Sequence, residues 1–220
     1  MVIKQNKTII IARHGSLHNP RNIVYNRDEI MDPEDIIHLS DKGKQQMRHL
    51  ASLIKKQRLV VEMIYSSPSV RAQESAKILS DELELDEIKI IKDLDDFYAP
   101  GPYKEGMTLD ELEEIRGNVY TEYWRKKHSH ELPEEIIVRM KKVFNEMVNS
   151  LQPGEVGILV SHGDAIAWLV NSLDPNQKPT PGNLRELHYP TKGEAAVIVV
   201  EKDGEIINIT FLKQPSSEIY

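Results

Sequence analysis

Two short motifs, Arg13-His14-Gly15 and Ser161-His162-Gly163, each place a histidine before a glycine, directly after an apolar stretch. Arg71 follows a third such stretch, about one helical turn beyond Ser66-Ser67-Pro68. An arginine presents a planar fork of donors that matches phosphoryl oxygens, and a glycine lets the backbone turn sharply and offer N–H groups to an anion. A neutral imidazole can attack phosphorus directly. These residue types therefore suit the transfer or hydrolysis of a phosphoryl group.

The apolar stretches are expected to be strands of one sheet. The β-branched run over 8–12 is typical of a strand buried on both faces of a parallel sheet. Further strands are predicted at 60–66, 88–91 and 156–160, and helices after Ser40, Pro68 and Thr108, from Pro133 and over 165–173. Residues 195–200 and 206–211 flank Asp203-Gly204, which indicates a hairpin at one edge of the sheet.

This alternation predicts an α/β fold, a three-layer α/β/α sandwich with a mostly parallel central sheet and an antiparallel edge strand. No linker, repeat or low-complexity segment interrupts it, so we expect a single domain over 1–220. Two long stretches, 18–38 and 97–106, resist a regular assignment. Since long loops of this kind are more often functional than accidental, we expect them to form walls of a pocket.

Ligands of open α/β sheets bind beyond the carboxyl ends of the strands. Arg13, His14, Arg71 and His162 all follow predicted strands and should therefore meet at one edge. Four groups that can carry positive charge repel one another unless an anion compensates them, and a phosphate group is the natural occupant. Phosphorylating and then dephosphorylating a histidine would divide hydrolysis into two easier steps, without a metal ion or other cofactor.

Composition excludes several kinds of site and argues against several kinds of partner. The 220 residues include 28 Lys and Arg against 35 Asp and Glu, a net charge of −7, and no cysteine. The absence of cysteine excludes thiolate nucleophiles, thiolate metal sites and disulfides. The acidic balance argues against nucleic acid or an anionic membrane as partner. The apolar run near the N-terminus is too short for a signal peptide or a membrane span, so we expect a cytoplasmic protein.

Three motifs together resemble the histidine phosphatase superfamily, also called the phosphoglycerate mutase-like family: Arg13-His14-Gly15, the segment 66–72 (SSPSVRA) and Ser161-His162-Gly163. Leu39-Ser40-Asp41-Lys42-Gly43 is similar to the start of the family's first helix. The resemblance implies that His14 accepts the phosphoryl group, that Arg13 and Arg71 clamp it, and that His162 is the second histidine that hydrogen-bonds it.

Two neighbouring aspartates are candidates for the proton donor. The family usually has a glutamate two residues after a leucine, and here that position is Asp96, in Leu94-Asp95-Asp96. Either Asp96 or its neighbour Asp95 could protonate the leaving oxygen, and we favour Asp96. Such a donor should be partly desolvated, because it must hold its proton near neutral pH.

Further residues are candidates for binding the substrate. Ser16 stands where the family often has an acidic residue, and Asn19 lies one place earlier than the family's usual asparagine. Arg21 or Arg27 could recognise the non-reacting part of the substrate, and Gly163 could offer its backbone N–H. The spacing of His128 and His130 is interpreted as a solvated helix end, since no third metal ligand is implied nearby.

Three functions stay open at this point. The favoured one is a phosphatase acting on a small phosphorylated substrate. A phosphoglycerate mutase would need a site for a second phosphate, whereas the middle segment offers only Arg116, Arg125 and Lys126-Lys127. A catalytically weak phosphate-binding module is the third possibility. Self-association to a homodimer is left open.

Overall fold

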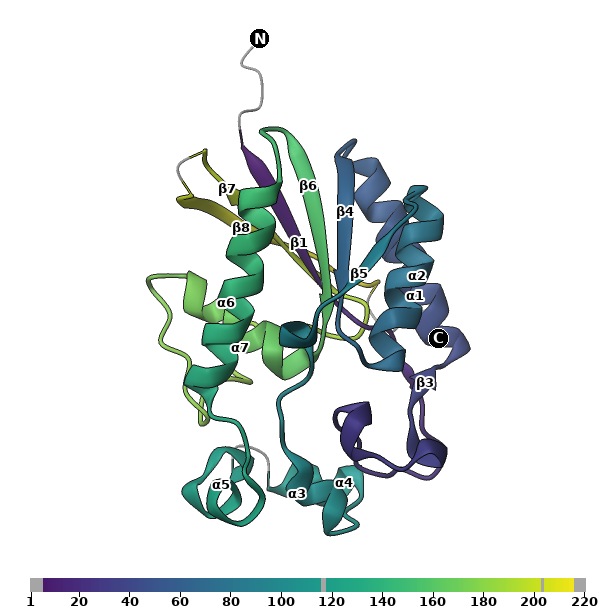
Figure 1. The fold of residues 1–220 in the computed structure, drawn as a ribbon, viewed down its shortest axis with the longest axis vertical. Helices are drawn as coiled ribbons and strands as arrows, with labels where there is room; N and C mark the ends of the chain where they lie inside the picture. Colours follow the sequence, from purple (N-terminus) through teal and green to yellow (C-terminus); the bar gives the residue numbers. More distant parts are fainter. Residues whose placement is uncertain (1–5, 116–117, 203, 216–220) are drawn as a thin grey trace.

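A six-stranded sheet forms the centre of the computed structural model, which describes residues 6–115, 118–202 and 204–215 (Figure 1). Across the sheet the order is β5 (Ile88–Ile90), β4 (Val60–Ser66), β6 (Glu155–Ser161), β1 (Lys7–Arg13), β7 (Ala195–Val200) and β8 (Ile206–Leu212). The first four strands run parallel, whereas β7 is antiparallel to both β1 and β8. The predicted mostly parallel sheet with an antiparallel edge is confirmed.

Helices cover both faces of this sheet, as the fold class requires (Figure 1). They are α1 (Asp41–Lys56), α2 (Val70–Leu83), α3 (Pro100–Lys104), α4 (Leu109–Glu114), α5 (Glu122–His128), α6 (Pro133–Ser150) and α7 (Gly163–Leu173). Two of the predicted caps are present: the Ser40 side chain accepts a hydrogen bond from the N–H of Gly43, and Thr108 forms a capping box with Glu111. In the part of the chain described, none of the helices has both the length and the apolar character needed to cross a bilayer.

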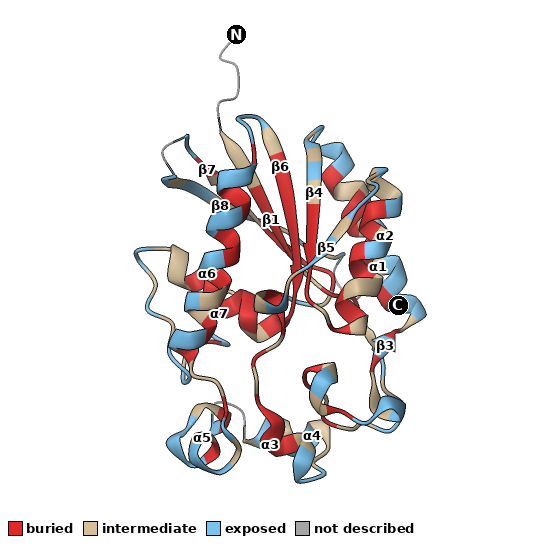
Figure 2. Cartoon of the chain, in the orientation of Figure 1, coloured by how far each residue is buried: buried red, intermediate tan, exposed pale blue. Residues whose placement is uncertain are grey.

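Alternation along the strands divides the core into two layers. Ile9 and Ile11 of β1 face α6 and α7, whereas Ile10 and Ala12 face α1 and α2. Figure 2 shows the buried side of each large helix turned toward the sheet. A central strand of a three-layer fold is apolar on both faces for this reason, which accounts for the continuous run in the sequence.

The two stretches without a regular assignment contain short elements. Residues 18–38 include the 3₁₀ turns η1 (Asp28–Ile30) and η2 (Pro33–Asp35), and are flanked by the pairing of β2 (Leu17–His18) with β3 (His38–Leu39). Residues 97–106 include α3. With α4 and α5, these segments form a cap beyond the carboxyl ends of the parallel strands (Figure 1). Elements of two to five residues are too short for a periodic sequence pattern to reveal.

His130 corrects the interpretation of 128–130 as a solvated helix end. Its side chain is buried in the cap, where Nδ1 lies 2.9 Å from the carbonyl oxygen of Val119 and Nε2 accepts a hydrogen bond from the N–H of Gly101. The ring also stacks on Trp124, with the two ring centroids 5.4 Å apart. The partners of this histidine, Gly101, Val119 and Trp124, come from other segments of the cap. The local spacing of polar residues therefore did not indicate that His130 is buried.

The loop after β1 is fixed by a close approach of two backbones. A Cβ atom on Gly15 would lie 2.4 Å from the carbonyl oxygen of Gly43, and one on Gly43 would lie 2.0 Å from that of Ser16. Neither contact is sterically possible, so only glycines allow the start of α1 to pack against the loop that carries His14.

We expect Gly43→Ala to lower the free energy of unfolding by about 2–3 kcal/mol, because backbone atoms cannot move aside as a flexible side chain would. Urea unfolding monitored by circular dichroism measures the loss. Gly182→Ala is the matched control: the nearest atom to a Cβ there is 4.0 Å away, and its effect should stay within about 0.5 kcal/mol. Equal effects of the two substitutions would contradict this account.

Candidate active site

His14 lies where β1 ends, beside the end of β6. Its backbone N–H donates to the carbonyl oxygen of Ser161, and its ring is 1 % exposed. Ring atom Nδ1 lies 2.9 Å from the carbonyl oxygen of Gly15, which can only accept, so Nδ1 carries the proton. The neutral ring therefore has its lone pair on Nε2. The local turn alone thus selects the tautomer that a nucleophilic histidine needs.

The surroundings of His14 keep its ring neutral. Burial lowers its pKa well below the usual 6.5, and the charges of Lys192, His162, Arg71 and Arg13 lower it further. A protonated imidazole here would be desolvated and face like charges on several sides. The predicted cluster of Arg13, His14, Arg71 and His162 is thus brought together in space.

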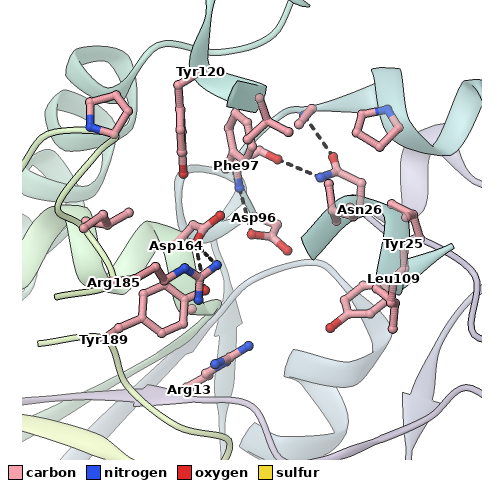
Figure 3. A pocket seen from close by; sticks show the side chains of 18 of the residues that line it. Arg13, Tyr25, Asn26, Asp96, Phe97, Leu109, Tyr120, Asp164, Arg185 and Tyr189 are labelled. Carbon is pink, nitrogen blue, oxygen red and sulfur yellow. Dashed lines mark hydrogen bonds and ion pairs between the residues drawn. The ribbon is translucent and has the colours of Figure 1, made fainter. Parts of the chain in front are cut away.

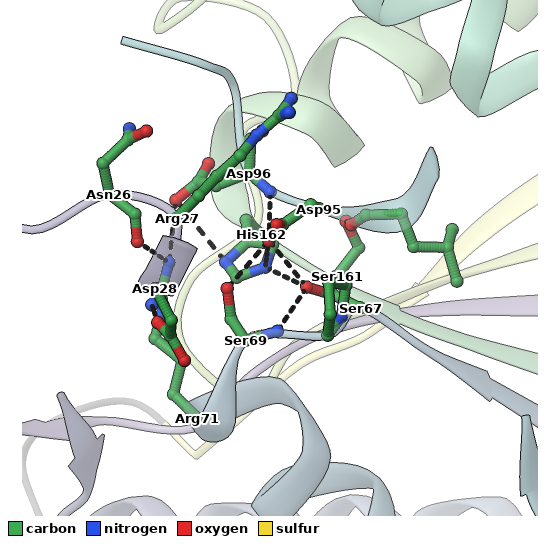
Figure 4. A network of polar contacts seen from close by, with 12 residues as sticks. Asn26, Arg27, Asp28, Ser67, Ser69, Arg71, Asp95, Asp96, Ser161 and His162 are labelled. Atoms are coloured by element: carbon green, nitrogen blue, oxygen red, sulfur yellow. Dashed lines mark hydrogen bonds and ion pairs between the residues drawn. The ribbon is translucent and has the colours of Figure 1, made fainter. Parts of the chain in front are cut away.

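The two arginines are held in different ways. Arg13 donates from Nη1 to the carbonyl oxygen of Pro190 at 2.8 Å. Arg71 is fully buried and donates to Asp28 Oδ1 at 3.1 Å, to the carbonyl oxygen of Asn26 at 2.8 Å and to Asp96 Oδ2 at 3.3 Å (Figure 4). Nε of each arginine is buried without a hydrogen-bond partner. Both guanidinium groups therefore keep unused donor capacity, which an anion at this edge could accept.

His162 begins a buried hydrogen-bonded chain. Ser67 Oγ lies 2.8 Å from His162 Nε2 and donates to Asp95 Oδ1 at 2.9 Å. Because the single hydroxyl proton of Ser67 points to the carboxylate, Nε2 of His162 must be the donor to Ser67. The other ring nitrogen, Nδ1, is buried, has no hydrogen bond and lies 3.5 Å from Asp96 Oδ2. A proton on either of these two atoms would make their contact attractive.

The two candidate proton donors have different environments. Asp95 is 2 % exposed, and its Oδ1 accepts from Ser67 Oγ, from Ser69 Oγ at 2.7 Å and from the N–H of Asp96 (Figure 4). These hydrogen bonds and the nearby His162 outweigh desolvation and hold the pKa of Asp95 far below its usual range. Asp96 instead lines the cavity beside His14. Its pKa is raised by burial but lowered more by His162 and Arg71, so the balance lies below the usual value.

Arg27 fixes the backbone of this acidic segment. Its Nε donates to the carbonyl oxygen of Asp96 at 2.6 Å, and its Nη2 lies 3.0 Å from Glu131 Oε2. Arg139 of α6 donates to the carbonyl oxygens of Asp95 and Asp96 at 2.8 and 3.1 Å. Arg27 is thus committed to the protein itself, and it does not line the cavity.

The remaining predicted substrate contacts also lie away from the cavity, apart from Gly163. Asn19 exchanges two hydrogen bonds with the backbone of Ile23, and Arg21 pairs with Asp35 while 58 % of its side chain is exposed. Ser16 lines a separate surface hollow. Gly163 does line the cavity, and a Cβ there would lie 2.5 Å from Tyr189 Oη.

Two further residues at this edge were missed from the sequence. Asp28 binds Arg71 and accepts from the N–H of Val70 at 2.6 Å, so it joins the cap to the start of α2. Lys192 is partly buried, donates to Tyr25 Oη at 3.0 Å and contributes to the lowered pKa of His14. Neither lies in a motif. Only the placement of Lys192 just before the β7 hairpin, beside the end of β1, could have indicated it.

A cavity of about 150 Å³ lies between the sheet and the cap (Figure 3), and His14 is among the residues that line it. Arg13, His14, Asp96 and Gly163 line the end at the sheet, and Val24, Phe97 and Leu112 lie among the apolar residues toward the cap. The stretches 18–38 and 97–106 both contribute to the lining, as predicted. The arrangement brings an unprotonated imidazole nitrogen, Arg13 and a carboxyl group together at the base of the cavity, with the buried Arg71 bonded to that carboxyl group.

Comparisons with known proteins find related sequences and similar folds. Over 175 residues the chain is 26 % identical to a 2,3-bisphosphoglycerate-dependent phosphoglycerate mutase from Parvibaculum lavamentivorans, covering 76 % of this chain and 79 % of the mutase. A mycobacterial glucosyl-3-phosphoglycerate phosphatase solved with VO3 superimposes with a TM-score of 0.68 at 19 % identity, covering 94 % of this chain and 99 % of the other. A phosphoserine phosphatase from Entamoeba histolytica, solved with 3-phosphoglyceric acid, superimposes with a TM-score of 0.67 at 18 % identity. The match covers 94 % of this chain and 98 % of the other.

The two structural likenesses are below 25 % identity and bear on the fold alone. Sequence comparison goes further, because residues 9–210 match the sequence model of the histidine phosphatase superfamily, branch 1. That match spans β1 through most of β8 and includes all three motifs around His14, Arg71 and His162. The chain belongs to the histidine phosphatase superfamily.

Proposed function

We propose that the protein is a metal-independent phosphomonoesterase that works through a phosphohistidine at His14. The observation that carries this proposal is the tautomer of His14: the hydrogen bond from Nδ1 to Gly15 leaves the lone pair on Nε2, in a ring kept neutral by burial. An uncharged imidazole beside Arg13 and Arg71 is suited to attack a phosphoryl group whose oxygens those arginines bind. The positive charge that a metal ion often supplies comes here from side chains.

In the first step Nε2 of His14 forms a bond to phosphorus while the bond from phosphorus to the alcohol oxygen breaks. The arginines and His162 stabilise the charge on the transferring group, and Asp96 gives its proton to the leaving oxygen. In the second step a water molecule attacks the phosphohistidine, and the Asp96 carboxylate takes a proton from that water. Inorganic phosphate leaves, and His14 and the protonated Asp96 are restored.

The pKa of Asp96 is lowered in the free protein, whereas a proton donor must hold its proton near neutral pH. A positive charge on His162 and that of Arg71 are what lower it; burial keeps His162 neutral, and Arg71 would turn its charge toward a bound phosphoryl group. A dianion next to the carboxylate also raises its pKa by direct repulsion. The 3.5 Å contact with the bare Nδ1 of His162 adds a further reason for this pair to hold one proton.

Charge at the cap supports hydrolysis over mutase chemistry. Arg125, Lys126 and Lys127 of the middle segment pair with Glu135, Glu122 and Glu105, respectively, and none of the three lines the cavity. Arg116 lies outside the described residues. A mutase needs cations that bind and retain a second phosphate. Among the described residues that line the cavity, Arg185 is the only cation besides Arg13, and it already pairs with Asp164.

We expect turnover of 4-nitrophenyl phosphate in excess chelator, and a loss of about 10³-fold or more in kcat for His14→Ala. Acid-labile labelling of the wild type, absent in His14→Ala, identifies the intermediate. His18→Ala, an exposed histidine in β2, is the control and should retain full activity. Retained phosphate affinity without turnover would instead indicate a binding module, and phosphoryl exchange between phosphoglycerates without net release would indicate a mutase.

Asp96→Asn should lower kcat by about 10²-fold or more for alkyl phosphates and far less for 4-nitrophenyl phosphate, because 4-nitrophenolate leaves without being protonated. Asp95→Asn should instead lower the free energy of unfolding and affect both ester types alike, since it weakens the hydrogen bonds from Ser67, Ser69 and Asp96. Steady-state kinetics on both esters, with urea unfolding, separates the roles. A leaving-group dependence in Asp95→Asn alone would assign the proton to Asp95.

The ring protons of His14 and His162 should titrate below pH 6.5 in the free protein, His14 well below, because burial lowers the pKa of both rings. Each folded ring then binds fewer protons than the unfolded chain, so stability falls as pH decreases below 6.5. NMR titration of the ring C–H signals measures the midpoints, with the His14 signal assigned by its loss in His14→Ala. A His14 midpoint at or above 6.5 would contradict a permanently neutral nucleophile.

A further inference from the structure

The cavity in front of His14 changes character from its base to its cap. Charged groups gather at the sheet, whereas Val24, Phe97, Leu109, Leu112, Tyr120 and Leu184 line the part beneath the cap. Accepting the phosphatase function proposed above, we propose that its substrate is the phosphate ester of a small, uncharged alcohol that carries an aromatic ring. The apolar part of the cavity takes the ring, and the phosphate lies at the arginines.

An aromatic pair provides a rigid surface for that ring. The rings of Phe97 and Tyr120 stack with centroids 4.6 Å apart and an angle of 29° between their planes. Tyr120 Oη accepts from Trp168 Nε1 at 3.0 Å, and the backbone of Phe97 is held by Asp96 and by Asn26 Nδ2 (Figure 3). Both rings are therefore oriented before any ligand binds, which reduces the entropy lost on binding.

The charges near this part of the cavity are already paired. Asp164 accepts from Tyr189 Oη at 2.7 Å and from Arg185 Nη2 at 3.1 Å. The Arg185 guanidinium also stacks on the Tyr189 ring, 3.4 Å from its centroid. A second anionic group on the alcohol would meet the Asp164 carboxylate, which repels it, and a guanidinium whose charge is already paired, and the hydroxyls of a sugar would lose water against apolar side chains.

The size of the cavity suits an alcohol with about one ring. Its volume of about 150 Å³ is in the range in which an apolar protein cavity accepts benzene. The ring would lie at the Phe97–Tyr120 pair, and a short chain would join it to the phosphate at the base, where Arg13 and His14 lie. Larger groups, such as a nucleoside or a disaccharide, would extend beyond the cavity.

The test compares esters whose leaving alcohols have similar intrinsic reactivity: 2-phenylethyl phosphate, glycerol 3-phosphate and 3-phosphoglycerate. We expect kcat/KM for 2-phenylethyl phosphate to exceed that for each of the other two by about tenfold or more, as pocket selectivity of this type allows. A higher kcat/KM for either polar ester, together with turnover that requires His14, would overturn the substrate proposal and leave the phosphatase function standing. No turnover of any ester would count against the phosphatase function itself.

Substitution of the wall makes the test specific to this cavity. Leu112→Asn places an amide among the apolar residues and should reduce the selectivity for 2-phenylethyl phosphate over glycerol 3-phosphate by about fivefold. Glu114→Gln, an exposed position on the same short helix α4, should leave that selectivity unchanged. An unchanged selectivity in a folded Leu112→Asn protein would contradict the proposed position of the ring.

A binding measurement covers the case in which Leu112→Asn fails to fold or no ester is turned over. Calorimetry on His14→Ala with 2-phenylethylphosphonate and with methylphosphonate measures what the ring adds without any chemistry. We expect the phenylethyl compound to bind about tenfold more tightly, from burial of the ring. Equal affinities would overturn the substrate proposal, whatever the outcome of the kinetic assays.

Discussion

Buried positive charge at the carboxyl edge of the sheet is the constraint on which the rest of the site depends. Arg71 is fully enclosed, and Arg13 and the two histidines lie beside it. A buried cation is costly unless carboxylates or carbonyl groups surround it. The carboxylates of Asp28 and Asp96 and the carbonyl of Asn26 do this for Arg71; Asn26 and Asp28 belong to the cap, and Asp96 to the segment that leads into it. The cap therefore supplies groups that stabilise the buried charge of Arg71, in addition to covering the site.

The acidic segment after β5 connects that cap to the body of the fold. Asp95 holds Ser67 and lies near His162, while Asp96 projects into the cavity. Because Arg27 and Arg139 bind the carbonyl groups of this segment, the two neighbouring carboxylates are held against different partners, Ser67 and Ser69 for Asp95 and Arg71 for Asp96. The Asp95 carboxylate is thereby saturated with hydrogen bonds, whereas that of Asp96 lines the cavity beside His14.

Much of the architecture could be predicted because it depends on local signals. Neighbouring residues are enough to indicate the β-branched strand β1, the helix N-caps at Ser40 and Thr108, and the apolar face of α6. The 3₁₀ turns and α3 of the cap were harder to predict, since they have too few residues to show a helical period and are ordered by contacts with distant segments. His130 shows the same limit: its polar neighbours suggested solvent, and Trp124 with the backbone of Gly101 buries it instead.

The sequence by itself determined the fold class, the strand ends and the four groups Arg13, His14, Arg71 and His162, because strand order and the rule for ligand sites of parallel sheets place them at one edge. Tertiary structure alone decided how the other polar residues are used. Arg21 and Arg27 look equivalent in the sequence, yet one pairs with Asp35 at the surface and the other is bound beneath the cap to the carbonyl of Asp96. The direction of a side chain, and hence its partner, depends on contacts between segments far apart in the chain, which local sequence does not encode.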